Sequence, residues 1–378
     1  MTPGLADGER LDWLRLYRSE NVGPIAFRRL LARFGSAAAA LDALPDLARC
    51  GGARRPVAIA SRAAAEAEAA AVAAIGGRLL ALPDADYPPL LRALADAPPL
   101  ICVLGRAELL HNRCVAVVGA RNASTSGCRI AAGLAHDLAE MGFAVVSGLA
   151  RGIDAAAHAG AGAARTVAVM AGGADVAYPS DNAVLHAKIR AEGCLVSEMP
   201  PGVEPQARHF PRRNRIVSGL AEGTVVVEAT ARSGSLITAR LAAEQGREVM
   251  AVPGSPADPR SAGPNRLIKD GAALVENAAD VAAALERPAR EDLFPGLAEA
   301  EAKVLPSRLS APLDGAKTAA EKRRTLLESL TTAPLPVDAA LRRCQLSAAE
   351  GAVALLELEL AGRIEHLPGQ MIALIPDP

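Results

Sequence analysis

The chain has 378 residues, half of them apolar, which is enough for two or three folded domains of about 100 to 200 residues each. Its 41 Lys and Arg and 42 Asp and Glu residues give a net charge of −1, so any anion site has to come from local clusters of charge. The six cysteines show no metal-ligand spacing, and neither a leader-like N-terminus nor an apolar run of about 18 residues occurs. We therefore expect a cytoplasmic protein without bound metal, cofactor or membrane segment.

Residues 8–75 show apolar residues at helical spacing on both sides of a break at Asn21-Val22-Gly23-Pro24. Helix, tight turn and helix is the outline of a helix-hairpin-helix or SAM-like unit, which we assign to residues 1–78. Such a hairpin can present backbone N–H groups to a phosphate, although most helical hairpins are structural.

Residues 79–286 alternate short apolar runs of strand type with helical patterns such as Cys128–Met141, after a Pro-rich connector within 79–110. Strands that are apolar along their whole length and separated by helices indicate a mostly parallel sheet with helices on both faces. The sequence therefore predicts an α/β, Rossmann-like core. Its expected strands are 114–118, 144–147, 166–170, 195–197, 224–228 and 248–252.

Small residues and arginines follow several of these strands. The segments are Gly119-Ala120-Arg121-Asn122, Ser147-Gly148 with Arg151-Gly152, Gly172-Gly173, and Arg232-Ser233-Gly234. In such sheets ligands lie outside the carboxyl ends of the strands. Glycine lets a phosphate approach the backbone, and helix N-termini offer free N–H donors. We expect arginine side chains and free backbone amides to form an anion-binding rim at this edge of the sheet. For any single turn, a glycine needed for a tight strand-to-helix connection is an equally good explanation.

The segment from Gln206 to Arg215 contains four arginines, one histidine and no acid. Arginine forks match phosphate oxygens, and Phe210 offers a flat face on which an unpaired base can stack. Duplex DNA hides its base faces, so this combination favours single strands. The alternative is a solvated loop, or arginines that pair with carboxylates of the same fold.

The sequence motifs that would indicate catalysis are weak or missing. Strand one is followed by Gly-Ala-Arg-Asn-Ala-Ser instead of a dinucleotide fingerprint, and no zinc-protease or P-loop motif occurs. Ser147, Asp154 and His158 are close in sequence but lack a nucleophile elbow, and the last two more plausibly pair or cap locally. Glu198 and Glu228 are better explained by helix capping or by ion pairs with rim arginines. We assign no catalytic residue.

After a linker at 287–317, residues 318–378 show three helical segments, 322–330, 337–344 and 347–360, and then a hairpin, 363–366 with 371–375. Ser347 and Glu350 form a capping box at the start of the third helix. That order is typical of a winged helix. The third helix, which usually reads DNA, carries Glu350, Glu357 and Glu359 and no basic residue, so phosphates would repel it. Our hypothesis is that this domain contacts protein or its own chain, not duplex DNA.

Five blocks, taken in order, carry a family resemblance. They are Val-Val-Gly-Ala-Arg, Ser-Gly-Leu-Ala-Arg-Gly-Ile-Asp, the segment 175–182, His-Phe-Pro-Arg-Arg-Asn-Arg-Ile-Val-Ser-Gly-Leu and Glu-Ala-Thr-Ala-Arg-Ser-Gly-Ser-Leu-Ile-Thr-Ala. From about residue 84 to 285 the chain resembles DNA-processing protein A, the DprA/Smf family. The resemblance implies a non-enzymatic protein that binds and protects incoming single-stranded DNA, loads RecA onto it during natural transformation, and forms a homodimer through the Rossmann-like domain.

The DNA contacts expected from these motifs, from the turns and from the arginine run are Gly119, Arg121, Ser147, Gly148, Arg151, Gly152, Arg208, Phe210, Arg213, Asn214, Arg215, Arg232, Ser233 and Gly234. The family commonly has Ser at the position of Ala120, Tyr at Ser126 and often Lys at Arg232. The first turn is therefore expected to contact DNA less fully than in other members. A nucleotide-processing enzyme of the nucleoside-monophosphate phosphoribohydrolase type is the alternative, but its Pro-Gly-Gly-x-Gly-Thr loop and following glutamate are missing here.

Overall fold

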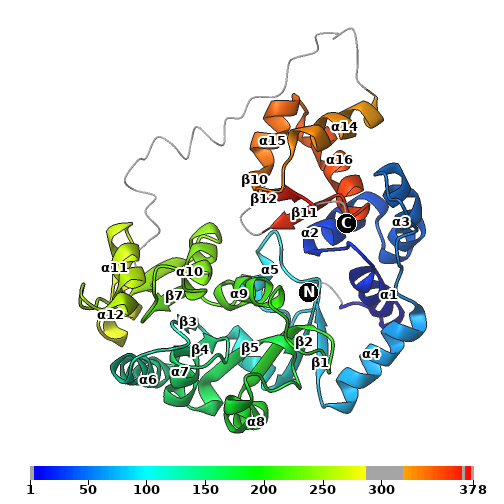
Figure 1. Cartoon of the computed structure of the whole chain (residues 1–378). Helices are drawn as coiled ribbons and strands as arrows, with labels where there is room; N and C mark the ends of the chain where they lie inside the picture. Colours follow the sequence, from blue (N-terminus) through cyan, green and yellow to red (C-terminus); the bar gives the residue numbers. More distant parts are fainter. Residues whose placement is uncertain (1–3, 287–317, 368–370, 376–378) are drawn as a thin grey trace.

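The structure, a computed structural model, describes residues 4–286, 318–367 and 371–375. Figure 1 shows an N-terminal group of helices, a central α/β body and a small C-terminal domain beside the N-terminal helices. The linker expected at 287–317 lies outside the described residues. Within the described ranges, no helix is both long and apolar enough to cross a membrane.

The N-terminal domain contains four helices, α1 (Asp7–Arg18), α2 (Pro24–Phe34), α3 (Ala37–Cys50) and α4 (Arg62–Ala74). The turn between α1 and α2 places Asn21 in the left-handed region, with φ of 62°. The α2–α3 turn uses Gly35 at φ of 78° as a C-cap and the Ser36 hydroxyl as an N-cap. Trp13 and Phe27 pack edge-on at the centre of its apolar core. The expected pair of helices joined by a tight turn is therefore confirmed.

The central sheet has nine strands in the order β1-β2-β6-β5-β4-β3-β7-β8-β9. From β6 to β9 all neighbours are parallel, whereas β1 and β2 add an antiparallel edge. The strands are β1 (Arg78–Ala81), β2 (Leu100–Gly105), β3 (Cys114–Val118), β4 (Ala144–Ser147), β5 (Thr166–Gly173), β6 (Cys194–Met199), β7 (Gly223–Val226), β8 (Glu248–Ala251) and β9 (Ala273–Leu274). The mostly parallel sheet is therefore confirmed, but β1 and β2 occupy much of the stretch expected to be a connector.

Helices cover both faces of this sheet, as predicted. Alternate residues of β3 show this directly, because Ala116 packs in the core on one face and Val117 in the core on the other. The first core includes residues of α5 (Pro89–Arg92), α9 (His209–Gly219) and α10 (Ser235–Glu244). The second is built on α6 (Thr125–Glu140), α7 (Ile153–Ala161) and α12 (Ala278–Glu286). Shorter connections run through α8 (Ala183–Glu192) and α11 (Ala262–Lys269).

The C-terminal domain is a winged helix with α14 (Ala319–Ser329), α15 (Val337–Cys344), α16 (Ala348–Leu360) and a sheet of β10 (Leu335–Pro336), β11 (Ile364–Leu367) and β12 (Met371–Leu374). The capping box of Ser347 and Glu350 is present. The third helix, α16, packs on the N-terminal domain, where Leu356 and Leu360 join the apolar core (Figure 1). The domain therefore contacts its own chain, one of the two partners that its acidic third helix suggested.

Candidate nucleic-acid interface

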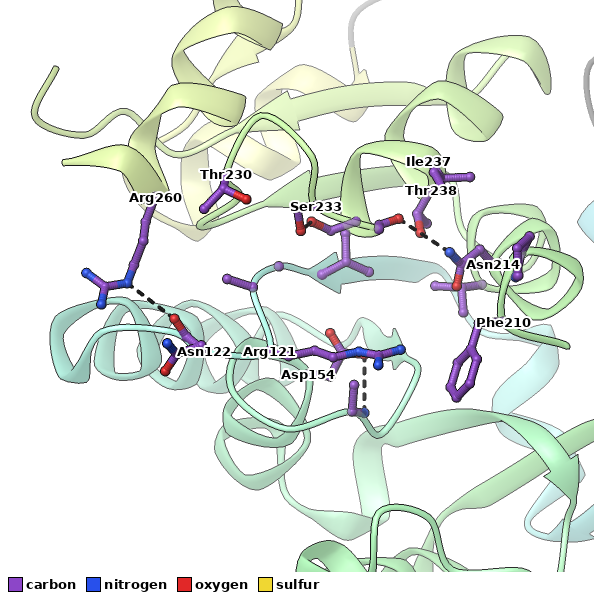
Figure 2. Close-up of a pocket in the computed structure, with 18 of the residues that line it drawn as sticks. Arg121, Asn122, Asp154, Phe210, Asn214, Thr230, Ser233, Ile237, Thr238 and Arg260 are labelled. Atoms are coloured by element: carbon purple, nitrogen blue, oxygen red, sulfur yellow. Dashed lines mark hydrogen bonds between the residues drawn. The ribbon is translucent and has the colours of Figure 1, made fainter. Parts of the chain in front are cut away.

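Two adjoining cavities of about 620 and 690 Å³ lie at the carboxyl edge of the sheet; we call them together the trough. Five residues line both cavities: Arg121, Asn122, Ala150, Phe210 and Arg213. The first cavity also includes Gly119, Asn214, Ser233 and Gly234, and the second Gly148 and Arg151. Figure 2 shows Arg121, Phe210 and Asn214 arranged around the first cavity. The fold thus brings nine of the fourteen expected contact residues into one concave surface.

Arg121 and Phe210 form the wall between the two cavities, since they line both, and Tyr178 continues this wall into the second cavity. The Arg121 guanidinium lies 4.7 Å from the centre of the Phe210 ring, and that ring lies 5.9 Å from the ring of Tyr178. Arg121 makes no ion pair with any described residue, and Tyr178 is 43% exposed. This wall presents flat faces and an unpaired positive charge at the same place, which suits a base beside its phosphate.

Arg213 forms the floor of the trough. Its side chain is 6% exposed, and Nη1 donates a hydrogen bond to the Val169 carbonyl. The guanidinium fills the space beside Gly148, where a Cβ would lie only 1.1 Å from Nη1. Burial lowers the pKa of Arg213, and the nearby Asp154 carboxylate opposes that shift. Burial in turn raises the pKa of Asp154, and the same arginine opposes it.

Several backbone amides at the first two turns, where free amides were expected, are already hydrogen-bonded. Glu228, which follows β7, accepts a hydrogen bond from the Ser124 amide at 2.8 Å and one from its hydroxyl at 2.6 Å, at the start of α6. Asp154 accepts from the amides of Gly148 and Ala150 at 3.2 and 3.4 Å. The expectation of free amides is therefore wrong for Ser124, Gly148 and Ala150, because carboxylates of the fold accept their hydrogen bonds. Guanidinium groups, not amides, supply the positive charge of the trough.

Two expected contact residues belong to the interior. Ser147 is fully buried, and its hydroxyl donates to the Val117 carbonyl at 2.6 Å. Arg215 is 4% exposed, pairs with Glu198 and donates to the Asp96 carbonyl. Burial acts to lower the pKa of Arg215, but Glu198 together with Tyr17, Asp96 and Tyr87 raises it above the ordinary value. Neither Ser147 nor Arg215 therefore lines the trough, and their contact with DNA stays a prediction. The ion pair expected for Glu198 is present.

Three more expected contacts lie outside both cavities. Arg208 and Arg232 are exposed and pair with no described carboxylate. Gly152 adopts φ of 75°, and a Cβ there would lie 2.3 Å from the Ala120 carbonyl, so this glycine shapes the turn. Arg151 does reach the second cavity but pairs with Asp181 at 2.8 Å, in a pair whose members are 61% and 58% exposed.

Several trough residues were not among the expected DNA contacts, including Asn122, Tyr178, Thr230, Thr238 and Arg260. Arg260 comes from the segment after β8, and its Nε donates to the Asn122 carbonyl at 3.2 Å (Figure 2). Nothing in the sequence around Arg260 points to the trough. For Tyr178 a signal existed, because it is one of only three tyrosines in the chain and lies in a block that carried the family resemblance.

The residues considered for catalysis each make separate internal contacts. A ring nitrogen of His158, Nδ1, lies 2.6 Å from the Thr166 hydroxyl. Burial lowers the pKa of His158 to about 3, so the ring is neutral at ordinary pH. Asp154 caps the β4–α7 turn and Glu228 caps α6, as their positions suggested. The described residues hold no group of three side chains suited to a metal ion.

Comparison with known proteins places these features in a family. Residues 78–286 match the family described as DNA recombination-mediator protein A, residues 7–71 a DprA-like N-terminal HHH domain, and residues 310–370 a DprA winged helix domain. Protein Smf of Escherichia coli (strain K12) is 40% identical over 296 residues, covering 76% of this chain and 75% of that protein. DNA processing protein DprA of Bacillus subtilis (strain 168) is 44% identical over 198 residues, covering 52% and 67%.

Two solved structures of DNA processing protein A also match this chain. The X-ray structure of DNA processing protein A from Streptococcus pneumoniae matches with a TM-score of 0.62 and 34% identity, covering 75% of this chain and 99% of that one. The protein of the same name from Helicobacter pylori, whose structure was described for its single-stranded DNA binding mode, matches with a TM-score of 0.51 and 28% identity, covering 55% and 95%. The chain therefore belongs to the DNA recombination-mediator protein A family, DprA/Smf.

Proposed function

We propose that this protein binds single-stranded DNA in the trough and acts as a recombination mediator. One observation carries the proposal: the wall between the two cavities combines the unpaired Arg121 guanidinium with the rings of Phe210 and Tyr178. A guanidinium attracts phosphate, and exposed ring faces stack on bases of any sequence. Bases in a duplex are already stacked and paired, so these ring faces favour a single strand.

The partners follow from the family. We propose that the protein protects incoming DNA in the cytoplasm, loads a RecA-type recombinase onto it during natural transformation, and works as a homodimer through the Rossmann-like domain. Sedimentation equilibrium tests the dimer, and the rate of recombinase filament assembly on strands coated with a single-strand-binding protein tests the loading. A monomer at micromolar concentration, or an unchanged assembly rate, contradicts the respective part.

The same site argues for binding and against catalysis. A phosphate-handling enzyme on such a sheet uses the free amides of a helix N-terminus and a carboxylate that is available for chemistry. Here Glu228 is hydrogen-bonded to the start of α6, and Asp154 to the turn before α7. Both carboxylates are therefore engaged in holding turns of the fold, and the loop and glutamate of a nucleoside-monophosphate phosphoribohydrolase are missing from the sequence. We therefore propose that the protein is not an enzyme.

A titration by fluorescence anisotropy tests the proposal. A labelled single strand of about 20 nucleotides should bind at least tenfold more tightly than the duplex of the same sequence, since only the single strand can stack its bases on the wall. Equal affinity for the two forms contradicts the proposal. Release of adenine from AMP at a steady enzymatic rate would favour the phosphoribohydrolase instead.

A further inference from the structure

The contact between the winged helix and the N-terminal domain covers the turn of the helical hairpin. Nδ2 of Asn21, in that turn, donates to the carbonyl of Leu360 at the end of α16, at 3.1 Å. Leu356 and Leu360 are buried in the apolar core of the N-terminal domain. At Gly51 the two domains come closest, because a Cβ there would lie 1.9 Å from the Glu357 carbonyl. The hairpin turn is thus closed by the acidic helix of the C-terminal domain.

A carboxylate of α16 lies at the N-terminus of α2. Oε1 of Glu359 is 3.6 Å from the point where a Cβ on Gly23, the N-cap of α2, would be. Helix geometry leaves the first amides of α2 without intrahelical partners, and the helix dipole favours an anion there. Burial lowers the pKa of Arg29 in the same helix, and the nearby Glu359 carboxylate partly opposes that shift. Glu359 therefore occupies a position with the electrostatics of a phosphate site.

Two buried polar atoms around this position lack partners among the described residues: Nη1 of Arg29 and Nε2 of His366. Nδ1 of His366 lies 2.9 Å from Oε2 of Glu359, within the C-terminal domain. The His366 side chain is only 7% exposed and lines a cavity of about 420 Å³ together with Gly23 and Glu359. Unpartnered buried polar atoms are costly in a finished interface. The presence of such atoms at this contact indicates that the Glu359 carboxylate can be replaced at the hairpin by another anionic group.

The trough and this cavity lie on either side of α9. Arg213 lines the trough, and the adjacent, exposed Arg212 lines the cavity beside the hairpin. A strand that leaves the trough over α9 would therefore meet Arg212 and then the hairpin turn. We infer that the hairpin turn, with Gly23 and Arg29, is a second site for the phosphodiester backbone of the bound strand, and that Glu359 of the winged helix fills it when the two domains are in contact. This inference rests on the proposed binding of single strands in the trough.

Gly51→Ala is designed to open the contact. Gly51 has φ of −71°, so alanine fits the N-terminal domain itself, while its Cβ would collide with the backbone of α16. The control is Gly8→Ala, in α1 of the same domain, where no atom lies within 4 Å of the added Cβ. Faster amide hydrogen exchange in α16 and α2 of Gly51→Ala, but not of the control, reports the opening. Leu356→Lys opens the same contact through its apolar part.

Affinity for thymidine oligomers of about 6 and about 30 nucleotides then tests the site. Opening should tighten binding of the long oligomer about threefold to tenfold and steepen its salt dependence by about one released counterion, leaving the short oligomer unchanged. Arg29→Ala in the Gly51→Ala background should cancel the gain. Faster exchange without tighter binding of the long oligomer overturns the inference, as does unchanged exchange in both opening variants. Failure of the wild type to bind even the short oligomer would instead reject the proposed function.

Discussion

The two faces of α9 carry arginines from one basic run, yet the fold uses them in opposite ways. Arg213 faces the trough, whereas Arg215 is paired with Glu198 between the sheet and the N-terminal domain. Residues two positions apart in an α-helix, such as Arg213 and Arg215, are separated by about 200° around the helix axis. The two arginines therefore cannot lie on the same face. The difference teaches that a basic segment marks a region for DNA binding, while the phase of its helix decides which side chains take part.

The largest expected effect is on the interior face. Arg215→Ala leaves the largely buried Glu198 carboxylate without its ion-pair partner, with only the Tyr17 hydroxyl still donating to it, and should lower the free energy of unfolding by about 3 kcal/mol. Urea unfolding followed by circular dichroism measures this loss. At temperatures where the variant is folded, its affinity for single strands should match that of the wild type. A variant of normal stability that binds DNA poorly would place Arg215 in the trough after all.

A second prediction concerns pH and the residues beneath the trough. The folded-state pKa of His158, about 3, lies below the ordinary value of 6.5, because burial and, to a smaller extent, Arg213 disfavour the charged ring. The unfolded chain therefore binds a proton that the folded chain does not, and the stabilisation is complete above pH 6.5 and lost as pH falls. Between pH 6.5 and 4 this loss should amount to about 3 kcal/mol.

His158→Gln isolates that contribution, since glutamine can keep a hydrogen bond to Thr166 and does not titrate. Unfolding titrations at several pH values should show a shallower decline for the variant than for the wild type. The raised pKa of Asp154 acts in the opposite direction and is common to both proteins. Parallel stability curves would show that His158 does not titrate as its burial implies.

A third, smaller effect belongs to the trough face. Phe210→Ala should weaken single-strand binding by about 1 to 3 kcal/mol, because a base loses its stacking surface. The unfolding midpoint should stay nearly constant, as the ring is only half-buried. Phe34→Ala is the control, since Phe34 also lies under an arginine, Arg33, at 5.4 Å, but in the N-terminal domain. Equal losses of affinity in the two variants would deny Phe210 a specific role.

The smallest expected effect concerns the cap of α6. Glu228→Gln keeps the shape of the side chain but weakens its contacts with the amide and hydroxyl of Ser124, at a cost of about 1 kcal/mol of stability. The variant should still lack AMP-cleaving activity and should keep its preference for single strands. Thermal unfolding and the anisotropy titration provide both measurements. A large loss of DNA affinity would mean that Glu228 acts on the trough and not only on its helix.

The periodicity of the sequence predicted the architecture because buried parallel strands and amphipathic helices have strong signatures. The short strands β1, β2 and β9 were missed, since β1 and β2 lie beside a Pro-rich stretch and β9 has two residues. At the site, the sequence identified the turns and the arginine run. It suggested that Glu228 and Asp154 act as caps but not which amides they bind, because those contacts join residues from different strand ends or fold back within a turn. Arg260 was missed for the same reason.

The missing side chain of Gly148 links two motifs that are far apart in the sequence. Its position is filled by the guanidinium of Arg213, so an alanine at 148 would force this buried guanidinium out of its place. In an alignment of family members these two columns should therefore change together, with a larger residue at the first accompanied by a shorter one at the second. Transfer of the basic segment 206–215 into a related protein therefore requires a glycine at the position of Gly148 as well.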